Sequence, residues 1–72
     1  MNRVAIFPGS FDPITVGHES VVLRSLSMFD KVIVAVGYNA SKKAFFSIDK
    51  RVEMIGKVFA NEPKVEVISY EG

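Results

Sequence analysis

The sequence predicts an α/β protein in which short parallel strands alternate with amphipathic helices. Three short runs contain β-branched residues, and the first two of them are apolar at consecutive positions, which is typical of strands in a parallel sheet that is covered on both faces. The two segments between these runs instead repeat apolar residues at helical spacing. Together these observations predict the order β-α-β-α-β.

The first strand is predicted over residues 3–7, and we expect the pair Pro8 and Gly9 to end it. The following segment, about 17–29, has apolar side chains at i, i+4 and i+7 and is predicted to be a helix. Thr15 is the candidate N-cap residue, because its hydroxyl can accept a hydrogen bond from a free N–H group in the first turn.

The second strand is predicted over residues 31–36 and is followed by a polar loop over 37–44. Ser47 is a plausible N-cap of the second helix, whose apolar positions fall on one clear face. The helix is expected to end at 61–63, an Asn-Glu-Pro sequence, and the third strand is predicted over 64–69.

Helical connections of about a dozen residues between buried strands imply parallel pairing with right-handed crossovers. We therefore predict a Rossmann-like βαβαβ half of a doubly wound parallel sheet, apparently truncated, with an unfilled edge and an uncovered face. Residues 1–72 contain no linker or repeat and are expected to be part of a single domain. Ligands of such sheets bind beyond the carboxyl ends of the strands, so the loops within 7–18 and 37–46 are predicted to share one rim.

Composition excludes several classes of function. Nine Lys and Arg against eight Asp and Glu give a net charge of +1, which provides no overall field for nucleic acid or membrane. The absence of cysteine excludes disulfides and thiolate metal sites and favours a cytoplasmic location, and one histidine cannot form a transition-metal cluster. The apolar run at 4–7 is too short for a signal-peptide core or a membrane span.

The stretch 7–18 is the strongest candidate for a binding site. It joins a strand to a helix, and free backbone N–H groups at a helix start favour anions. His18, in the first helical turn, could point a ring N–H at a bound phosphate and stabilise charge on a transferring phosphoryl group, or it could be a capping or surface histidine. The G-x-x-x-x-G-K-[ST] and G-x-G-x-x-G patterns are absent, which leaves phosphate chemistry by positioning and electrostatics.

Other residues of this stretch have both functional and ordinary interpretations. The Ser10 hydroxyl could donate to a phosphate oxygen, or it could be a turn hydroxyl. Gly9 and Gly17 could allow an approach that a Cβ would block, or they could be turn glycines. Asp12 is expected to fix the loop, since a free carboxylate repels phosphate.

The second rim loop contains Lys42 and Lys43. A lysine at this position could reach a phosphate as a mobile point charge, although two solvated loop lysines are the ordinary interpretation. On the second helix, Arg51 and Lys57 are expected to be solvated.

The sequence Phe-Pro-Gly-Ser-Phe-Asp-Pro-Ile-Thr-x-Gly-His at 7–18 resembles the start of the bacterial phosphopantetheine adenylyltransferase family. Its last four residues resemble the H/T-x-G-H signature of nucleotidyltransferases. Pro8 and Thr15 favour this family over nicotinate-mononucleotide adenylyltransferases and cytidylyltransferases, which usually have Gly-Gly-Thr-Phe-Asp-Pro and a first histidine. Ser41-Lys42-Lys43 and Arg51-Val52 extend the resemblance over essentially the whole chain.

The resemblance implies transfer of the adenylyl group of ATP to 4′-phosphopantetheine in coenzyme A biosynthesis, giving dephospho-coenzyme A and pyrophosphate, with Mg²⁺ as cofactor. It implies that His18 stabilises the transition state and that Ser10 contacts both substrates. It also implies that Phe11 and Gly17 contact ATP and that Lys42 binds phosphopantetheine and orients its phosphate. No side chain is identified as a metal ligand. The residues expected to set the loop geometry are Pro8, Gly9, Asp12 and Thr15.

Members of the resembled family are longer and hexameric, and carry further arginines and a C-terminal loop that holds the ATP phosphates. We therefore expect residues 1–72 to be the N-terminal part of such an enzyme, whose full-length form is a homo-oligomer, and we expect no efficient catalysis by this part alone. The alternative from another class is a non-catalytic nucleotide-binding module.

Overall fold

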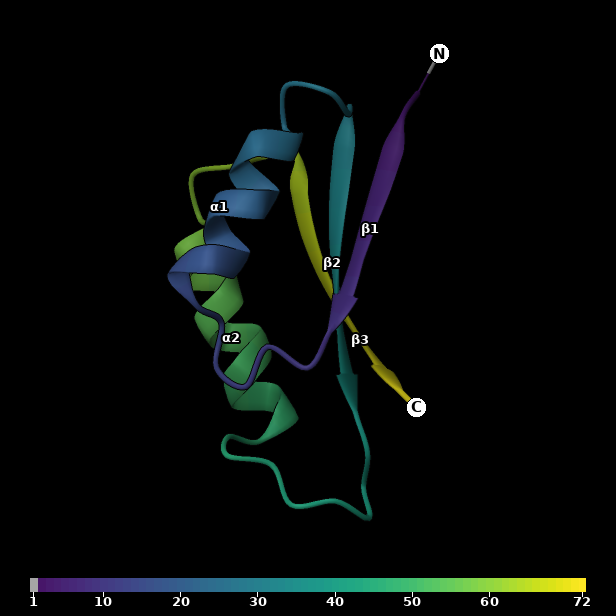
Figure 1. The fold of residues 1–72 in the computed structure, drawn as a ribbon, viewed down its shortest axis with the longest axis vertical. Coiled ribbons are helices and arrows are strands. Elements are labelled where there is room, and N and C mark those ends of the chain that lie inside the picture. The colour runs from purple at the N-terminus through teal and green to yellow at the C-terminus, as the bar shows by residue number, and fades with distance from the viewer. Residues whose placement is uncertain (1) are drawn as a thin grey trace.

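The structure is a computed structural model, and it describes residues 2–72. The three strands form one parallel sheet in the order β1-β2-β3, and both helices lie on the same side of it (Figure 1). This arrangement confirms the predicted α/β order. The elements along the chain are β1 (Val4–Gly9), α1 (Val16–Ser25), β2 (Lys31–Tyr38), α2 (Ile48–Val58) and β3 (Val65–Glu71).

The strands are longer than predicted at their carboxyl ends. Strand β1 does not end before Pro8 but continues through Gly9, with Pro8 opposite Ala35 of β2. Among the described residues β1 has a neighbour on one side only, and an edge strand tolerates a proline that a central strand would exclude. Strand β2 likewise runs to Tyr38, so the polar loop that follows it starts later than predicted.

Helix α1 is shorter than the predicted 17–29 and ends at Ser25. The Ser25 hydroxyl donates to the carbonyl of Val21, and the Ser27 hydroxyl donates to that of Arg24, so side chains compete for the last helical carbonyls. The predicted N-caps are confirmed in both helices. Thr15 caps α1, and Ser47 caps α2 by accepting a hydrogen bond from the Lys50 N–H at 3.1 Å.

The core lies between the sheet and the two helices. Its largest fully buried side chains alternate along β2 or come from the inner faces of the helices: Val32, Val34, Val36, Val22 and Ile55. The opposite face of the sheet is uncovered, as predicted, and Ile6 there is 61% exposed. No helix described between residues 2 and 72 is long and apolar enough to cross a membrane.

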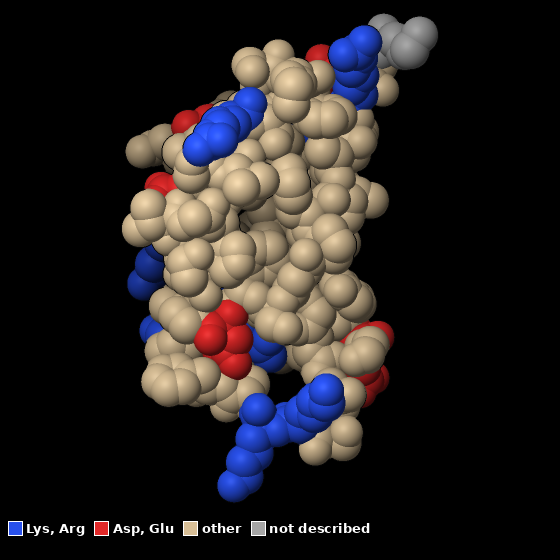
Figure 2. All heavy atoms as spheres, in the orientation of Figure 1, with Lys and Arg blue, Asp and Glu red and all other residues tan. Residues whose placement is uncertain are grey.

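The sheet brings two loops together at its carboxyl edge. The loop between β1 and α1 and the longer loop between β2 and α2 both lie at the lower end of the view in Figure 1. In the same orientation, basic side chains project from this end over the β2–α2 loop, whereas the middle of the visible face carries no charge (Figure 2). The carboxyl edge, with its two loops and its basic side chains, is therefore the candidate location of a binding site.

Candidate functional site

The Asp12 carboxylate joins the two loops of the carboxyl edge. Its Oδ2 accepts a hydrogen bond from the backbone N–H of Phe45 at 2.6 Å, and its Oδ1 accepts one from that of Phe46 at 2.7 Å. Hydrogen bonds to an ionised carboxylate are shorter and stronger than those between neutral groups. Both Asp12 oxygens are thus engaged in holding the β2–α2 loop against the β1–α1 loop.

Phe11 anchors the same loop in the core. Its side chain is buried, and its backbone lies in the left-handed region with φ of 47°. This conformation costs a non-glycine residue on the order of 1 kcal/mol, which burial of a phenylalanine side chain offsets. A Cβ on Gly9 would lie 3.1 Å from the Phe11 ring, so the close approach of this ring favours glycine at position 9.

Arg51 is buried, and the prediction that it is solvated is wrong. Its residue exposure is 4%, and its Nη1 donates to the carbonyl of Ser10 at 3.0 Å and to that of Gly37 at 3.2 Å. Arg51 lies one turn before Ile55 on the face of α2 that packs against the sheet. The i, i+4 spacing between Arg51 and Ile55 indicates that both side chains lie on the buried face of the helix. The prediction of a solvated side chain followed instead from the usual exposure of arginine.

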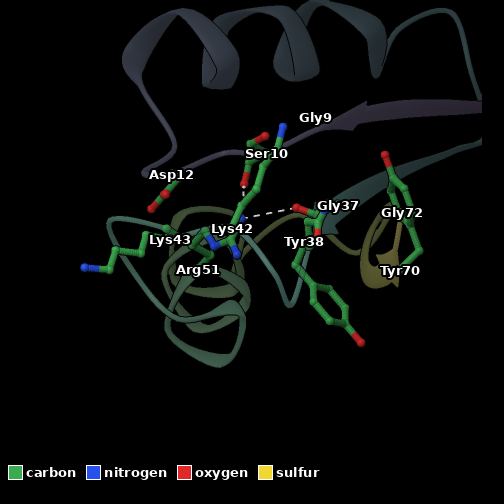
Figure 3. Close-up of a pocket in the computed structure, with 12 residues that line it drawn as sticks. Gly9, Ser10, Asp12, Gly37, Tyr38, Lys42, Lys43, Arg51, Tyr70 and Gly72 are labelled. Carbon is green, nitrogen blue, oxygen red and sulfur yellow. Dashed lines mark hydrogen bonds between the residues drawn. The ribbon is translucent and has the colours of Figure 1, made fainter.

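A cavity of about 340 Å³ opens between the two loops and the end of the sheet. Figure 3 shows the Arg51 guanidinium between Ser10 and Gly37, while Lys43 extends away from it. Three cationic side chains and one carboxylate line the cavity, so it favours an anionic ligand. The lining residues are Gly9, Ser10, Asp12, Gly37, Tyr38, Asn39, Lys42, Lys43, Ala44, Arg51, Tyr70 and Gly72.

Lys42 belongs to a turn that is held by Asn39. The Asn39 side-chain oxygen accepts hydrogen bonds from the N–H and the hydroxyl of Ser41, at 2.9 and 2.7 Å. The Lys42 N–H donates to the Asn39 carbonyl at 3.1 Å. The backbone at Lys42 is therefore ordered while its side chain remains exposed, an arrangement that suits a lysine reaching toward a phosphate.

His18 forms a reciprocal pair with Thr15 at the start of α1. The Thr15 hydroxyl oxygen accepts from the His18 N–H at 3.3 Å, and the Thr15 N–H donates to His18 Nδ1 at 3.0 Å. Because Nδ1 is the acceptor, the hydrogen of the neutral ring lies on Nε2. The Phe11 ring meets the His18 ring edge-on, with the centroids 4.8 Å apart. The imidazole thus has a fixed orientation, and its Nε2–H has no hydrogen-bond partner among residues 2–72.

The structure does not bring His18 and Lys42 into one cavity. His18 lines a smaller hollow of about 130 Å³ together with Phe11, whereas Ser10 and Lys42 line the main cavity. The two spaces are lined by consecutive residues of the β1–α1 loop, Ser10 in the main cavity and Phe11 in the smaller hollow. Gly17 lines neither of them, and a Cβ there would meet Thr15 Oγ1 at an ordinary 3.6 Å. The structure therefore gives no steric reason for glycine at position 17.

Metal-ligand geometry is absent from residues 2–72, where no three His, Asp or Glu side chains are grouped closely enough to hold an ion. The side chains at the carboxyl edge can accordingly bind an anion and donate hydrogen bonds, but they do not form a carboxylate site for Mg²⁺.

Comparison with known proteins gives one family model and many relatives. The family model described as cytidylyltransferase-like matches residues 6–72. A phosphopantetheine adenylyltransferase of Flavobacterium johnsoniae is 54% identical over 97% of this chain and 46% of its own length. One from Anaeromyxobacter sp. is 47% identical over 100% of this chain and 44% of its own. The chain spans about half the length of the curated relatives it matches.

Solved structures agree on the fold. A NadR protein in complex with NAD and AMP-PNP superposes with a TM-score of 0.88 over 100% of this chain and 21% of its own, at 20% identity. A bifunctional NMN adenylyltransferase/ADP ribose pyrophosphatase from Francisella tularensis, complexed with AMP and a manganese ion, gives a TM-score of 0.73 at 25% identity. This superposition covers 99% of the present chain and 22% of the Francisella protein.

Proposed function

The chain belongs to the cytidylyltransferase-like family, and on this premise we propose that the protein transfers the adenylyl group of ATP to 4′-phosphopantetheine. The products are dephospho-coenzyme A and pyrophosphate. The observation that carries the proposal is the 54% identity over 97% of this chain to a phosphopantetheine adenylyltransferase. The cationic cavity supports it, because the proposed acceptor is a phosphate monoester.

In the proposed reaction, an oxygen of the phosphopantetheine phosphate attacks the α-phosphorus of ATP. One P–O bond forms to this oxygen, the bond between the α-phosphorus and the bridging oxygen breaks, and pyrophosphate leaves with the bonding electrons. Phosphoryl transfer of this kind needs positioning and charge stabilisation but no covalent enzyme intermediate. The exposed lysines and donors of the carboxyl edge match these requirements.

His18 is proposed to stabilise the transition state rather than to remove a proton. Its Nδ1 is occupied by the Thr15 N–H, so the ring offers an Nε2–H donor to a non-bridging oxygen of the α-phosphate. The Thr15 pair and the Phe11 ring hold the imidazole in place before the substrate arrives. A donor that is already oriented stabilises developing charge without reorganisation during the reaction.

The acceptor is proposed to bind in the main cavity. Lys42 contacts its phosphate and orients the attacking oxygen, and Ser10, which lines the same cavity, contacts both substrates. The backbone N–H groups of Phe11 and Gly17 are proposed to contact ATP. Phe11 is well suited to this role, because its backbone is fixed by a buried ring and by the neighbouring Asp12.

We propose Mg²⁺ bound through the ATP phosphates as the cofactor, since the described side chains do not form a metal site of their own. The ion would neutralise charge on the polyphosphate. The family resemblance also supports a homo-oligomeric assembly and a cytoplasmic location for the full-length protein.

The test is a substrate panel with the full-length protein. ATP is offered with 4′-phosphopantetheine, with nicotinamide mononucleotide or with nicotinate mononucleotide, and released pyrophosphate and product mass are measured. A parallel reaction offers CTP in place of ATP. We expect turnover only with ATP and 4′-phosphopantetheine. Turnover with either mononucleotide instead, or ATP binding without any transfer, would overturn the proposal.

A further inference from the structure

Arg51 is a buried cation that no carboxylate pairs with among residues 2–72. Its residue exposure is 4%, and it takes part in none of the ion pairs of these residues. Its Nη1 donates to two backbone carbonyls, but its Nε is buried without any hydrogen-bond partner. A buried charge is costly unless an opposite charge compensates it, so this guanidinium favours the entry of an anion.

The other charged groups of the cavity do not balance Arg51. Lys42 and Lys43 add further positive charge to the same walls. Asp12 is the one side-chain carboxylate of the lining, so the three cationic side chains exceed it by two positive charges, and both of its oxygens accept hydrogen bonds from the backbone N–H groups of the β2–α2 loop. A phosphate monoester, with a charge of about −1.5 to −2 at neutral pH, matches the excess of positive charge.

Arg51 also fixes the backbone on which the cavity is built. One nitrogen of its guanidinium bridges the carbonyl of Ser10, just after β1, and that of Gly37 within β2 (Figure 3). Ser10 is otherwise part of an exposed loop. The bridge therefore keeps the Ser10 side chain at the wall of the cavity, next to the cationic groups that would face the phosphate.

We propose that Arg51 is a positioning residue that determines specificity for the phosphorylated acceptor. It holds the Ser10 loop against the end of β2, and its buried charge makes the cavity prefer 4′-phosphopantetheine over pantetheine, the same molecule without phosphate. This inference rests on the proposed function. The lysines of the rim differ from Arg51 in that their side chains are exposed and their charges are screened by water.

The experiment compares Arg51→Gln with Arg51→Lys in the full-length protein. Both side chains keep an N–H donor for the backbone carbonyls, but only lysine keeps the charge. Dissociation constants for 4′-phosphopantetheine and for pantetheine are measured by titration calorimetry. We expect Arg51→Gln to reduce the preference for the phosphorylated ligand by about tenfold or more, and Arg51→Lys to reduce it by less than about threefold.

Lys57→Gln is the matched control, because it removes one positive charge from the same helix at a side chain that is 76% exposed. We expect it to leave the preference unchanged. Equal weakening of both ligands by Arg51→Gln indicates a merely structural role and overturns the proposal. If the glutamine variant does not fold, loss of the preference in folded Arg51→Lys overturns it equally, and retention supports it.

The assay of the unsubstituted protein tests the proposed function separately from the role of Arg51. An unsubstituted protein that forms no dephospho-coenzyme A overturns the function and this inference with it. Adenylyl transfer by the unsubstituted protein, together with an unchanged ligand preference in Arg51→Gln, overturns the inference alone.

Discussion

The carboxylate of Asp12 accepts a hydrogen bond of 2.7 Å from the backbone N–H of Phe46, 34 residues further along the chain. With the second bond to Phe45, it joins the loop that follows β1 to the loop that follows β2. Asp12 therefore contributes to the site by joining its two loops. It fixes the relative position of the loops that contain Ser10 and Lys42.

Replacement of Asp12 by asparagine is expected to loosen this junction. An asparagine amide has one acceptor oxygen, so one of the two N–H groups would face an NH₂ group instead. We expect a loss of about 1–3 kcal/mol in unfolding free energy, measured by urea denaturation, and a higher KM for the acceptor. Asp30→Asn is the control, because Asp30 accepts a single bond, from the Arg3 N–H, at the opposite end of β1. An unchanged KM in Asp12→Asn would contradict the junction's role.

Thr15→Val is expected to affect both the stability of α1 and the rate of transfer. Loss of the hydroxyl cap costs about 1 kcal/mol, and it also removes the 3.1 Å contact of the Thr15 hydroxyl with His18 Nδ1, one of the two contacts with Thr15 that orient the ring. Ser47→Ala removes the corresponding cap of α2, away from His18, and should cost similar stability without lowering kcat. Thermal unfolding and steady-state kinetics distinguish the two effects. A kcat as high in Thr15→Val as in Ser47→Ala would contradict the orienting role.

His18→Ala is expected to reduce kcat by about 10²–10³-fold, because removal of one oriented donor to a developing oxyanion typically has an effect of this size. The side chain is exposed, so the variant should fold normally. His18→Gln keeps an amide donor and should lose less activity. Circular dichroism checks the fold beside the pyrophosphate-release assay. A full rate in His18→Ala would refute the proposed role.

Lys42→Ala and Lys43→Ala form a matched pair, since both lysines line the cavity from adjacent positions. The turn held by Asn39 orders the backbone at Lys42, whereas Lys43 points outward in Figure 3. We expect Lys42→Ala to raise the KM for 4′-phosphopantetheine about tenfold or more, and Lys43→Ala to raise it less than about threefold. Equal effects of the two substitutions would mean that the rim binds the acceptor only through its overall charge.

The stability of α2 is expected to depend on pH through Glu53. A hydrogen bond from Lys50, and then the charges of Lys50 and Lys57, lower the pKa of Glu53 from its ordinary value of 4.5. A lowered native pKa means that this carboxylate stabilises the folded state above pH 4.5 and that the contribution is lost as the pH falls through the native pKa. Glu53→Gln should therefore lower the urea midpoint slightly at pH 7 and low salt. The difference should vanish in acid, and also at high salt, because the side chain is exposed.

Sequence patterns over a few residues predicted the helix N-caps correctly but not the ends of β1 and α1. Thr15 and Ser47 were identifiable as N-caps because each bonds to an N–H three residues away. The end of β1 was predicted two residues too early, because Pro8 stops a central strand but not an edge strand, and edge position is a property of the sheet. The end of α1 was predicted too late, since apolar spacing continues past Ser25 while the hydrogen bonds do not.

By itself, the sequence determined the order of strands and helices, the parallel topology and the polar loops at the carboxyl edge, because hydrophobic periodicity and capping act over a few residues. Tertiary structure alone decided that Asp12 binds the N–H groups of the second loop, that Arg51 is buried beneath Ser10, and that His18 and Lys42 line separate spaces. These contacts join residues far apart in the chain. Their geometry depends on the register of the sheet and on how the helices pack against it. Neither property can be predicted from a pattern of neighbouring residues.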